Sequence, residues 1–132
     1  MTRLLHALVF ASTLGVSQEA YEVPEGAYLL PKVPPNYREW HRAAQECAES
    51  LGAGRMRPFE EIEWWGVPGD FFGLYGGDGF AGYYDSRPRP KRIYIVESWG
   101  LDMSLIRHEA LHHALEPEIG HPAPPFGFCE YP

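Results

Sequence analysis

Histidine is concentrated in one short stretch near the end of the chain. Four of its six histidines lie in the segment SLIRHEALHHALEPEIGHPAPPFGFC, which runs from Ser104 to Cys129. His108 and His112 have the i, i+4 spacing that places two side chains on one face of a helix, so both imidazoles can bind one metal ion. Glu109 follows the first of them and completes the pattern H-E-x-x-H. The segment therefore predicts a helical metal site with a carboxylate beside it.

The pattern also predicts a reaction. Zinc lowers the pKa of a bound water to about 7, and Glu109 could then take the proton of that water and pass it to a leaving group. We expect Zn²⁺ as the cofactor and Glu109 as the catalytic general base. The alternative is a solvated helix face on which these residues are merely polar. Leu101, Leu105 and Leu115 share the histidine face and would then be exposed too, which argues against this alternative.

A catalytic zinc ion needs a third protein ligand and an open position. Three residues beyond the motif could supply that ligand: Glu116, Glu118 and His121. Glu116 continues the helical series but adjoins Pro117, and in a straight helix it would project along the axis. Glu118 has the offset of the third histidine in a longer form of the motif, which requires a glycine where this chain has Leu115.

His121 is the third ligand that we expect. Gly120 before it permits a tight reversal and Pro122 after it stiffens the chain, so the segment can return over the exposed helix face. Glu116 and Glu118 remain the alternatives. His113 points about 100° away from His112 on the helix, so we expect it beside the site or at the surface.

Two helices and a few strands must position these residues. The first helix is predicted from Asn36, as N-cap in a capping box with Glu39, to about Gly52, with an apolar stripe that includes Trp40 and Cys47. The second is predicted over residues 101–115 and is stopped by Pro117. After Pro117 we expect an irregular C-terminal tail.

The region between the helices has the period of strands. FEEIEWWGV predicts a strand that ends at Pro68, Gly76–Gly79 predicts a turn between short strands, and KRIYIVES (Lys91–Ser98) alternates clearly. We expect a small, mainly antiparallel sheet of about three strands. The fold class that follows is α+β in a single domain.

The N-terminal residues differ from the rest of the 132-residue chain. Arg3 precedes a short apolar run and then small residues, the order of a secretory signal peptide, and the run is too short to span a membrane. We therefore divide the chain into a signal peptide (1–17), an extended proline-rich lead-in (18–35) and one domain (36–132). We expect an exported protein, periplasmic or secreted, without a membrane span after signal removal. The net charge of −7 argues against a nucleic-acid partner.

The two cysteines are far apart in sequence and form no C-x-x-C pair. In an exported chain this arrangement predicts one structural disulfide between Cys47 and Cys129. It would close a loop of about 80 residues, worth on the order of 4 kcal/mol in the chain-entropy model. The bond would tie the tail to the first helix and hold the His121 turn in place. The alternative is two buried free thiols.

These features together resemble the zincin metallopeptidases. The strand followed by an H-E-x-x-H helix matches their minimal core, and GHPAPPF is similar to the minimal zincins, in which a third histidine and then a phenylalanine follow the motif. Residues 36–129 also resemble small exported bacterial proteins with a Trp- and Cys-bearing first helix, H-E-x-x-H, a Gly-His-Pro turn and a C-terminal Cys. The resemblance implies metal binding by His108, His112 and His121, with Glu109 as base. It also implies that an edge strand, here Gly79–Asp85, holds the substrate.

The function that we expect is zinc-dependent peptidase, with a peptide or protein substrate and hydrolysis through a metal-activated water. The chain has no room for the second subdomain of larger zincins, which argues against efficient cleavage of folded proteins. The alternative function is a non-catalytic zinc-binding module that binds a partner through the aromatic stretch Phe71–Tyr84. The group that stabilises the oxyanion stays open among four tyrosines: Tyr83, Tyr84, Tyr94 and Tyr131.

Overall fold

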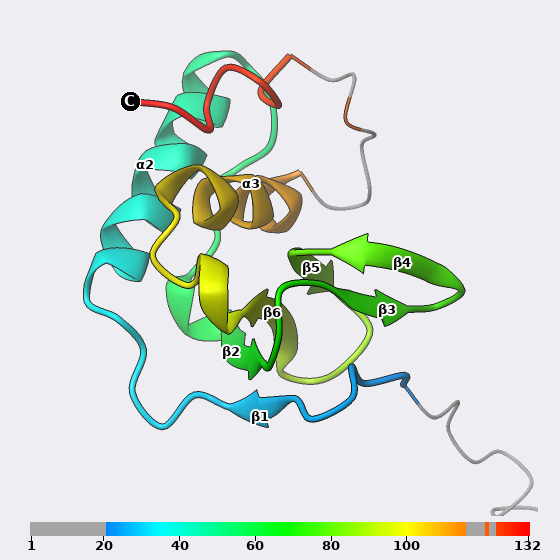
Figure 1. Cartoon of the computed structure of the whole chain (residues 1–132). Helices are drawn as coiled ribbons and strands as arrows, with labels where there is room; N and C mark the ends of the chain where they lie inside the picture. The colour runs from blue at the N-terminus through cyan, green and yellow to red at the C-terminus, as the bar shows by residue number, and fades with distance from the viewer. Residues whose placement is uncertain (1–20, 116–120, 122–123) are drawn as a thin grey trace, which may run out of the picture.

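The computed structural model describes residues 21–115, 121 and 124–132, and Figure 1 shows their arrangement. The expected signal peptide (1–17) lies outside these residues. Helices and strands are combined, as expected for an α+β chain. The helices and strands in order are β1 (Tyr28–Leu29), α2 (Asn36–Ser50), β2 (Ile62–Val67), β3 (Phe72–Leu74), β4 (Gly77–Phe80), β5 (Gly82–Asp85), β6 (Lys91–Val96) and α3 (Met103–Ala114).

The main sheet has four strands in the order β1-β2-β6-β5. Its central pair, β2 and β6, is parallel, with Ile62 opposite Lys91 and Val67 opposite Val96. The outer pairs, β1 with β2 and β5 with β6, are antiparallel. The main sheet is therefore mainly antiparallel, as expected, but it has four strands rather than about three, and its parallel central pair was not expected. Turn signals in a sequence predict the pairing of strands that are neighbours along the chain. Strands β2 and β6 are not neighbours, because the chain between them leaves the main sheet to form the β3–β4 hairpin before it returns.

The missed strand lies in the proline-rich segment 18–35, where we expected an extended lead-in without regular structure. Tyr28 and Leu29 pair with Gly66 and Trp65 of β2. The ring of Tyr28 lies against Gly66, where a Cβ atom would come within 2.7 Å of it. Part of the lead-in is thus an edge strand of the sheet.

Strands β3 and β4 form a separate hairpin. We expected the turn at Gly76–Gly79, but β4 already begins at Gly77 and the turn is Tyr75-Gly76. Both turn residues have positive φ, 49° and 78°, the combination that suits a two-residue hairpin turn. Tyr75 tolerates this conformation because Glu22 accepts a hydrogen bond from its backbone N–H at 2.6 Å.

Helix α2 begins one residue away from the expected position. Asn36 is its first residue rather than its N-cap, and Pro35 occupies the cap without a side-chain hydrogen bond. Pro35 already has helical φ and ψ of −61° and −26°, so proline rigidity replaces the capping box. The helix ends at Ser50, and Gly52 follows with a φ of 74°, close to the expected end.

The core has a layer on each face of the main sheet. Ile93 and Ile95 of β6 face a cluster with Tyr37 of α2 and Ile106 of α3. The intervening Tyr94 and Val96 face the β3–β4 hairpin, where they pack with further buried residues that include Val67, Phe72 and Leu74. The alternation of KRIYIVES therefore sends successive side chains of β6 to opposite faces of the sheet, and both faces are buried.

Helices α2 and α3 pack against each other through small residues. Ala44 and Ala48 of α2 meet Ala110 and Leu111 of α3, and Cys129 of the tail joins the same cluster. Short side chains allow the two helix backbones to approach closely. In Figure 1 the red C-terminal tail lies beside α2 and α3, on the side away from the sheet. The tail and α3 together carry the residues of the predicted site.

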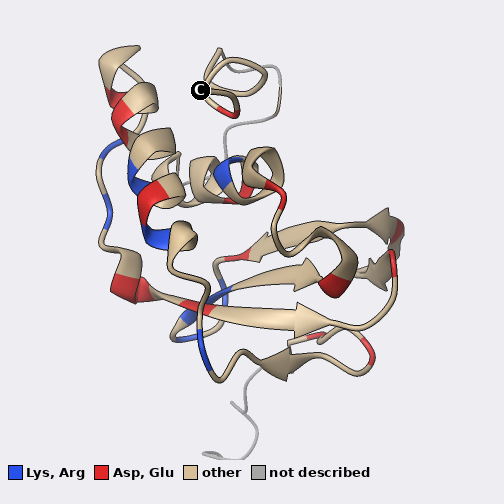
Figure 2. Cartoon of the chain, turned by 60° about the vertical axis from the view of Figure 1, so that its left-hand side comes forward, with Lys and Arg blue, Asp and Glu red and all other residues tan. Residues whose placement is uncertain are grey.

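Charged residues of both signs occur in many parts of the described chain. Figure 2 shows acidic and basic residues interspersed along helices, strands and loops. No helix in the described ranges is long and apolar enough to cross a membrane.

Candidate metal centre

Helix α3 places His108 and His112 on one face, as their spacing predicts. The helix starts at Met103 because Asp102 caps it, accepting a hydrogen bond from the backbone N–H of Leu105 at 2.9 Å. Both histidines are half-buried. We expected Leu101 to share the histidine face of this helix, and this is wrong. Leu101 precedes the helix and is 76% exposed. It therefore cannot serve as core for the histidine face.

The third histidine comes from the tail. His121 lies with its Nε2 atom 3.1 Å from Nε2 of His112, whose own Nε2 is 3.3 Å from that of His108. One ligand atom from each of the three residues lies within 4.8 Å of the others, which is close enough for one metal ion. The alternative third ligands, Glu116 and Glu118, lie outside the described residues. The structure thus brings together the three histidines that we expected as ligands.

Phe126 packs against all three imidazoles. Its ring centroid lies 5.1 Å from that of His108, 4.8 Å from that of His112 and 5.1 Å from that of His121. Such contacts restrict ring rotation and exclude water from one side of the cluster. Phe126 is the phenylalanine that follows the third histidine in the GHPAPPF segment.

The tail is bound to α2 by the expected disulfide. The Sγ atoms of Cys47 and Cys129 are 2.09 Å apart, and their Cα atoms are 5.6 Å apart. Cys129 is fully buried, and its backbone N–H donates to the carbonyl oxygen of Pro125 at 2.8 Å. The bond therefore anchors the turn that carries Phe126 beside the histidines.

Glu109 is buried beside the cluster, with only 3% of its surface exposed. Burial raises the pKa of its carboxyl group to about 8, the charge of Glu130 adds to the rise, and a hydrogen bond with the backbone of Tyr84 opposes it. Its Oε2 atom has no hydrogen-bond partner among the described residues. A buried carboxyl oxygen without a partner is unusual and suggests a group that acts on something bound nearby.

Burial also keeps His112 neutral. Burial, with smaller contributions from the neighbouring His108 and His121, lowers the pKa of the imidazole to about 4. A neutral imidazole is the form that binds a metal, because the lone pair of its nitrogen is then free.

A groove beside the motif is formed by three parts of the chain: α3 with the turn before it, the β4–β5 region and the tail. His108 and Glu109 line one side of it, together with Leu105 from the preceding turn of α3. The other lining residues come from the end of β4 and the start of β5, the turn before α3 and the first turn of α3, and the tail: Gly79, Phe80, Ala81, Gly82, Trp99, Asp102, Ser104 and Glu130. Strand β5 is an edge strand of the main sheet. The expected substrate strand Gly79–Asp85 corresponds to the end of β4 together with β5.

The tyrosines considered for an oxyanion role do not line this groove in the described structure. Tyr94 is fully buried on the hairpin side of the sheet. Tyr84 is buried with its ring centroid 5.7 Å from that of His113. Tyr131 is 57% exposed at the end of the chain. The positions of these tyrosines leave the oxyanion role unassigned.

His113 has the opposite environment from its neighbour His112. It is fully buried, which corrects the expectation of a position beside the site or at the surface. Its Nε2 atom lies 2.8 Å from a carboxylate oxygen of Glu61, and its Nδ1 atom lies 2.9 Å from Nε2 of His41. Gln45 contacts both rings, at 3.0 and 3.3 Å. His41, Gln45 and His113 form a buried polar cluster between α2 and α3, and the half-buried Glu61 contacts it from the segment before β2.

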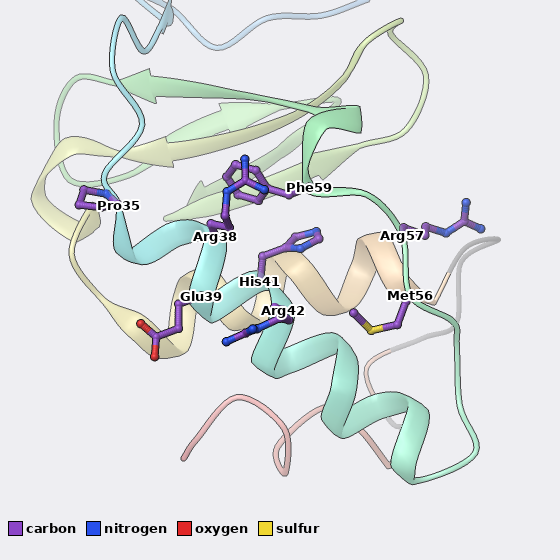
Figure 3. A pocket seen from close by; sticks show the side chains of 8 residues that line it. All are labelled: Pro35, Arg38, Glu39, His41, Arg42, Met56, Arg57 and Phe59. Carbon is purple, nitrogen blue, oxygen red and sulfur yellow. The ribbon is translucent and has the colours of Figure 1, made fainter.

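Sequence reasoning missed His41 and Gln45, although a signal was present. Both lie within the stripe that Tyr37, Ala44 and Ala48 define on α2, and all five residues are buried. Figure 3 shows His41 in a pocket between α2 and the Met56–Phe59 segment, lined also by three arginines. The ring of Phe59 stands edge-on to His41 with centroids 5.4 Å apart.

The aromatic stretch Phe71–Tyr84, considered as a partner surface for a non-catalytic module, has exposed, half-buried and buried positions. Phe71 is 57% exposed, but Phe72, Leu74 and Tyr84 are buried. Of its aromatic rings, that of Phe71 is exposed, and those of Tyr75, Phe80 and Tyr83 are half-buried.

The chain was compared with models of protein families, with characterised proteins and with solved structures, and no match was found in any of the three comparisons.

Proposed function

We propose that the protein is a zinc-dependent metallopeptidase that hydrolyses peptide bonds with Glu109 as general base. The observation that carries the proposal is the position of Glu109, which is buried, has an oxygen without a partner among the described residues, and lines the same groove as His108. A site that only held a metal for stability would need no such carboxylate, and structural zinc sites usually have four protein ligands. We also propose that the fold is a minimal form of the zincin fold.

The donor set supports zinc as the metal. His108, His112 and His121 offer three imidazole nitrogens, and imidazole is a ligand that zinc prefers. Three protein ligands leave one position open to solvent or substrate, which is the arrangement of catalytic zinc sites. When bound, zinc would lower the pKa of water and polarise a carbonyl oxygen.

Glu109 would move the proton of the attacking water. The water oxygen forms the new bond to the carbonyl carbon, the C–N bond breaks, and Glu109 carries the water proton to the leaving amine nitrogen. A cation held by the neighbouring imidazoles would lower the raised pKa of Glu109 and so favour the ionised form that accepts a proton. The burial of Glu109 excludes bulk water, which strengthens the interaction of its carboxylate with nearby charges.

The groove would hold the substrate peptide. Strand β5 lies at the sheet edge next to α3, and an extended peptide could add to such an edge through backbone hydrogen bonds. The proposal places the protein outside the cytoplasm, because disulfides such as Cys47–Cys129 persist in oxidising compartments.

The test compares Glu109→Gln with the unaltered protein on a quenched fluorescent peptide library, with zinc content measured on both. Glutamine has nearly the shape of glutamate but cannot accept the proton, so we expect zinc to be retained and hydrolysis to fall by roughly 100- to 10,000-fold. Glu49→Gln, which removes the same charge from an exposed position on α2, is the matched control and should change neither quantity.

Equal cleavage by Glu109→Gln and the unaltered protein would refute the mechanism. So would loss of zinc in Glu109→Gln alone, since Glu109 would then be needed to build the site. Zinc binding by both proteins without cleavage of any library peptide would favour the non-catalytic module instead.

A further inference from the structure

Glu130 contacts His108, the first of the three clustered histidines along the chain. Its Oε1 atom is 3.0 Å from Nδ1 of His108, on the ring nitrogen that does not face the other histidines. The side chain of Glu130 is 15% exposed and that of His108 is 26% exposed. The two residues are 22 positions apart, so only the packing of the tail on α3 creates this contact.

The position of the Glu130 carboxylate is determined by more than this one contact. Its Oε1 atom also accepts the backbone N–H of Gly127 at 3.1 Å. The preceding residue, Cys129, is buried and bonded to Cys47 of α2. A carboxylate held in this way has little rotamer freedom to lose when it binds a partner.

An ionised carboxylate can only accept hydrogen bonds, which determines the tautomer of the ring it contacts. Nδ1 of His108 must carry the proton and donate it to Glu130. Nε2 then carries the lone pair, and this is the atom that lies 3.3 Å from Nε2 of His112. The same contact sets the plane of the ring, so that the lone pair is directed into the cluster of three imidazoles.

We propose that Glu130 is a positioning residue for the metal centre, which holds His108 in the Nδ1–H tautomer and orients its Nε2 atom towards the metal. The inference rests on the proposed binding of metal by the three histidines. Carboxylates in this position make the imidazole more basic and orient it, and their loss typically lowers metal affinity by about 10- to 100-fold.

Because one oxygen of Glu130 accepts hydrogen bonds from both His108 and Gly127, two substitutions of Glu130 test its role. Glu130→Ala removes both contacts, the one to His108 and the one to Gly127. Glu130→Gln keeps an acceptor oxygen for both N–H groups but loses the charge. Glu49→Gln removes one carboxylate from the exposed side of α2 and is the control for net charge.

The first measurement is zinc affinity, obtained by competition with a chelating dye on the full disulfide-bonded protein. We expect affinity to fall about 10- to 100-fold in Glu130→Ala, to fall by less in Glu130→Gln, and to stay unchanged in Glu49→Gln. The second measurement, on metal-free protein, is the tautomer of each histidine from long-range ¹H–¹⁵N NMR correlations. His108 should be Nδ1–H in the unaltered protein and should shift towards Nε2–H in Glu130→Ala, whereas His113, which contacts Glu61, should not change.

The outcomes separate this inference from the proposed function. Zinc binding of equal strength in the unaltered protein and Glu130→Ala would overturn the positioning role and leave the peptidase proposal standing. A His108 that is Nε2–H in the unaltered protein would overturn it as well. If the unaltered protein binds no zinc, the proposed function fails, and the NMR tautomers alone decide whether Glu130 orients His108. If Glu130→Ala does not fold, the same two comparisons are made with Glu130→Gln.

Discussion

Cys129 in the tail is bonded to Cys47 on α2, and the residue that follows Cys129, Glu130, contacts His108 of the three-histidine cluster. The disulfide thus fixes to the first helix the tail residue that is hydrogen-bonded to His108. Its effects on stability and on metal affinity should be coupled.

The first prediction concerns this bond. Cys47→Ser combined with Cys129→Ser frees a loop closed over a sequence separation of 82, and we expect the free energy of unfolding to fall by about 2–5 kcal/mol. Zinc affinity should fall as well, because the tail no longer holds Glu130 and Phe126 against the histidines. Urea unfolding and chelator competition measure the two effects, and non-reducing mass analysis first checks that the unaltered protein has no alkylatable thiol. Two free thiols in natively folded exported protein would disprove the pairing.

The second prediction identifies the ligands. His112→Ala should lose most of its zinc by elemental analysis, since two remaining imidazoles bind the ion weakly. His121→Ala should behave in the same way, while Glu118→Ala and Glu116→Ala should retain zinc. Retention of zinc in His121→Ala together with loss in either glutamate variant would show that the third ligand comes from residues 116–118.

The third prediction uses the close approach of β5 to α3. A Cβ atom at Gly82 would lie 3.0 Å from Cδ1 of Leu105 and 3.1 Å from Oε1 of Glu109. Gly82→Ala should therefore displace the Glu109 carboxyl by a few tenths of an ångström and destabilise the fold by about 1–3 kcal/mol. Zinc content should be unchanged, and peptide hydrolysis should fall by up to about 100-fold, because catalysis depends steeply on placement.

The control for this substitution is Gly100→Ala. Its added Cβ would lie 3.4 Å from the nearest atom, which is ordinary contact, so we expect little change in either quantity. If Gly82→Ala hydrolyses peptides as fast as the unaltered protein, the position of Glu109 does not limit the reaction.

The fourth prediction concerns pH and the buried polar cluster. Burial, with a smaller contribution from the neighbouring His113, lowers the pKa of His41 to about 4. Between pH 6.5 and 4 the unfolded chain therefore binds a proton that the folded protein does not, so stability decreases as pH falls through this window. The slope contributed by His41 is at most about 1.4 kcal/mol per pH unit.

Urea unfolding of metal-free protein at pH 7 and pH 5 measures this effect, with His41→Gln as the comparison. The unaltered protein should lose about 1–2 kcal/mol more than the variant over this interval. Equal losses would mean that His41 titrates alike in the folded and unfolded states.

The periodicity of the sequence was sufficient to predict features that depend only on residues of one helix or one strand. The i, i+4 spacing alone places His108 and His112 on one face of α3, and the alternation of KRIYIVES alone identifies β6. Each of these depends only on the repeat of a helix or a strand, which the backbone imposes on any sequence. The cysteine count in a chain with a leader-like start was likewise enough to predict the Cys47–Cys129 bond.

Tertiary structure decided the features that join distant segments. The parallel pairing of β2 with β6, the contact of Glu130 with His108 and the contact of His41 with His113 all depend on how helices, sheet and tail pack together. The helical repeat can place His41 on the buried stripe of α2, but no local repeat specifies which residue of another element a polar side chain will meet. The His108–Glu109–His112 motif could therefore be read from the sequence, while the residues that orient and surround it emerged only when the chain was folded.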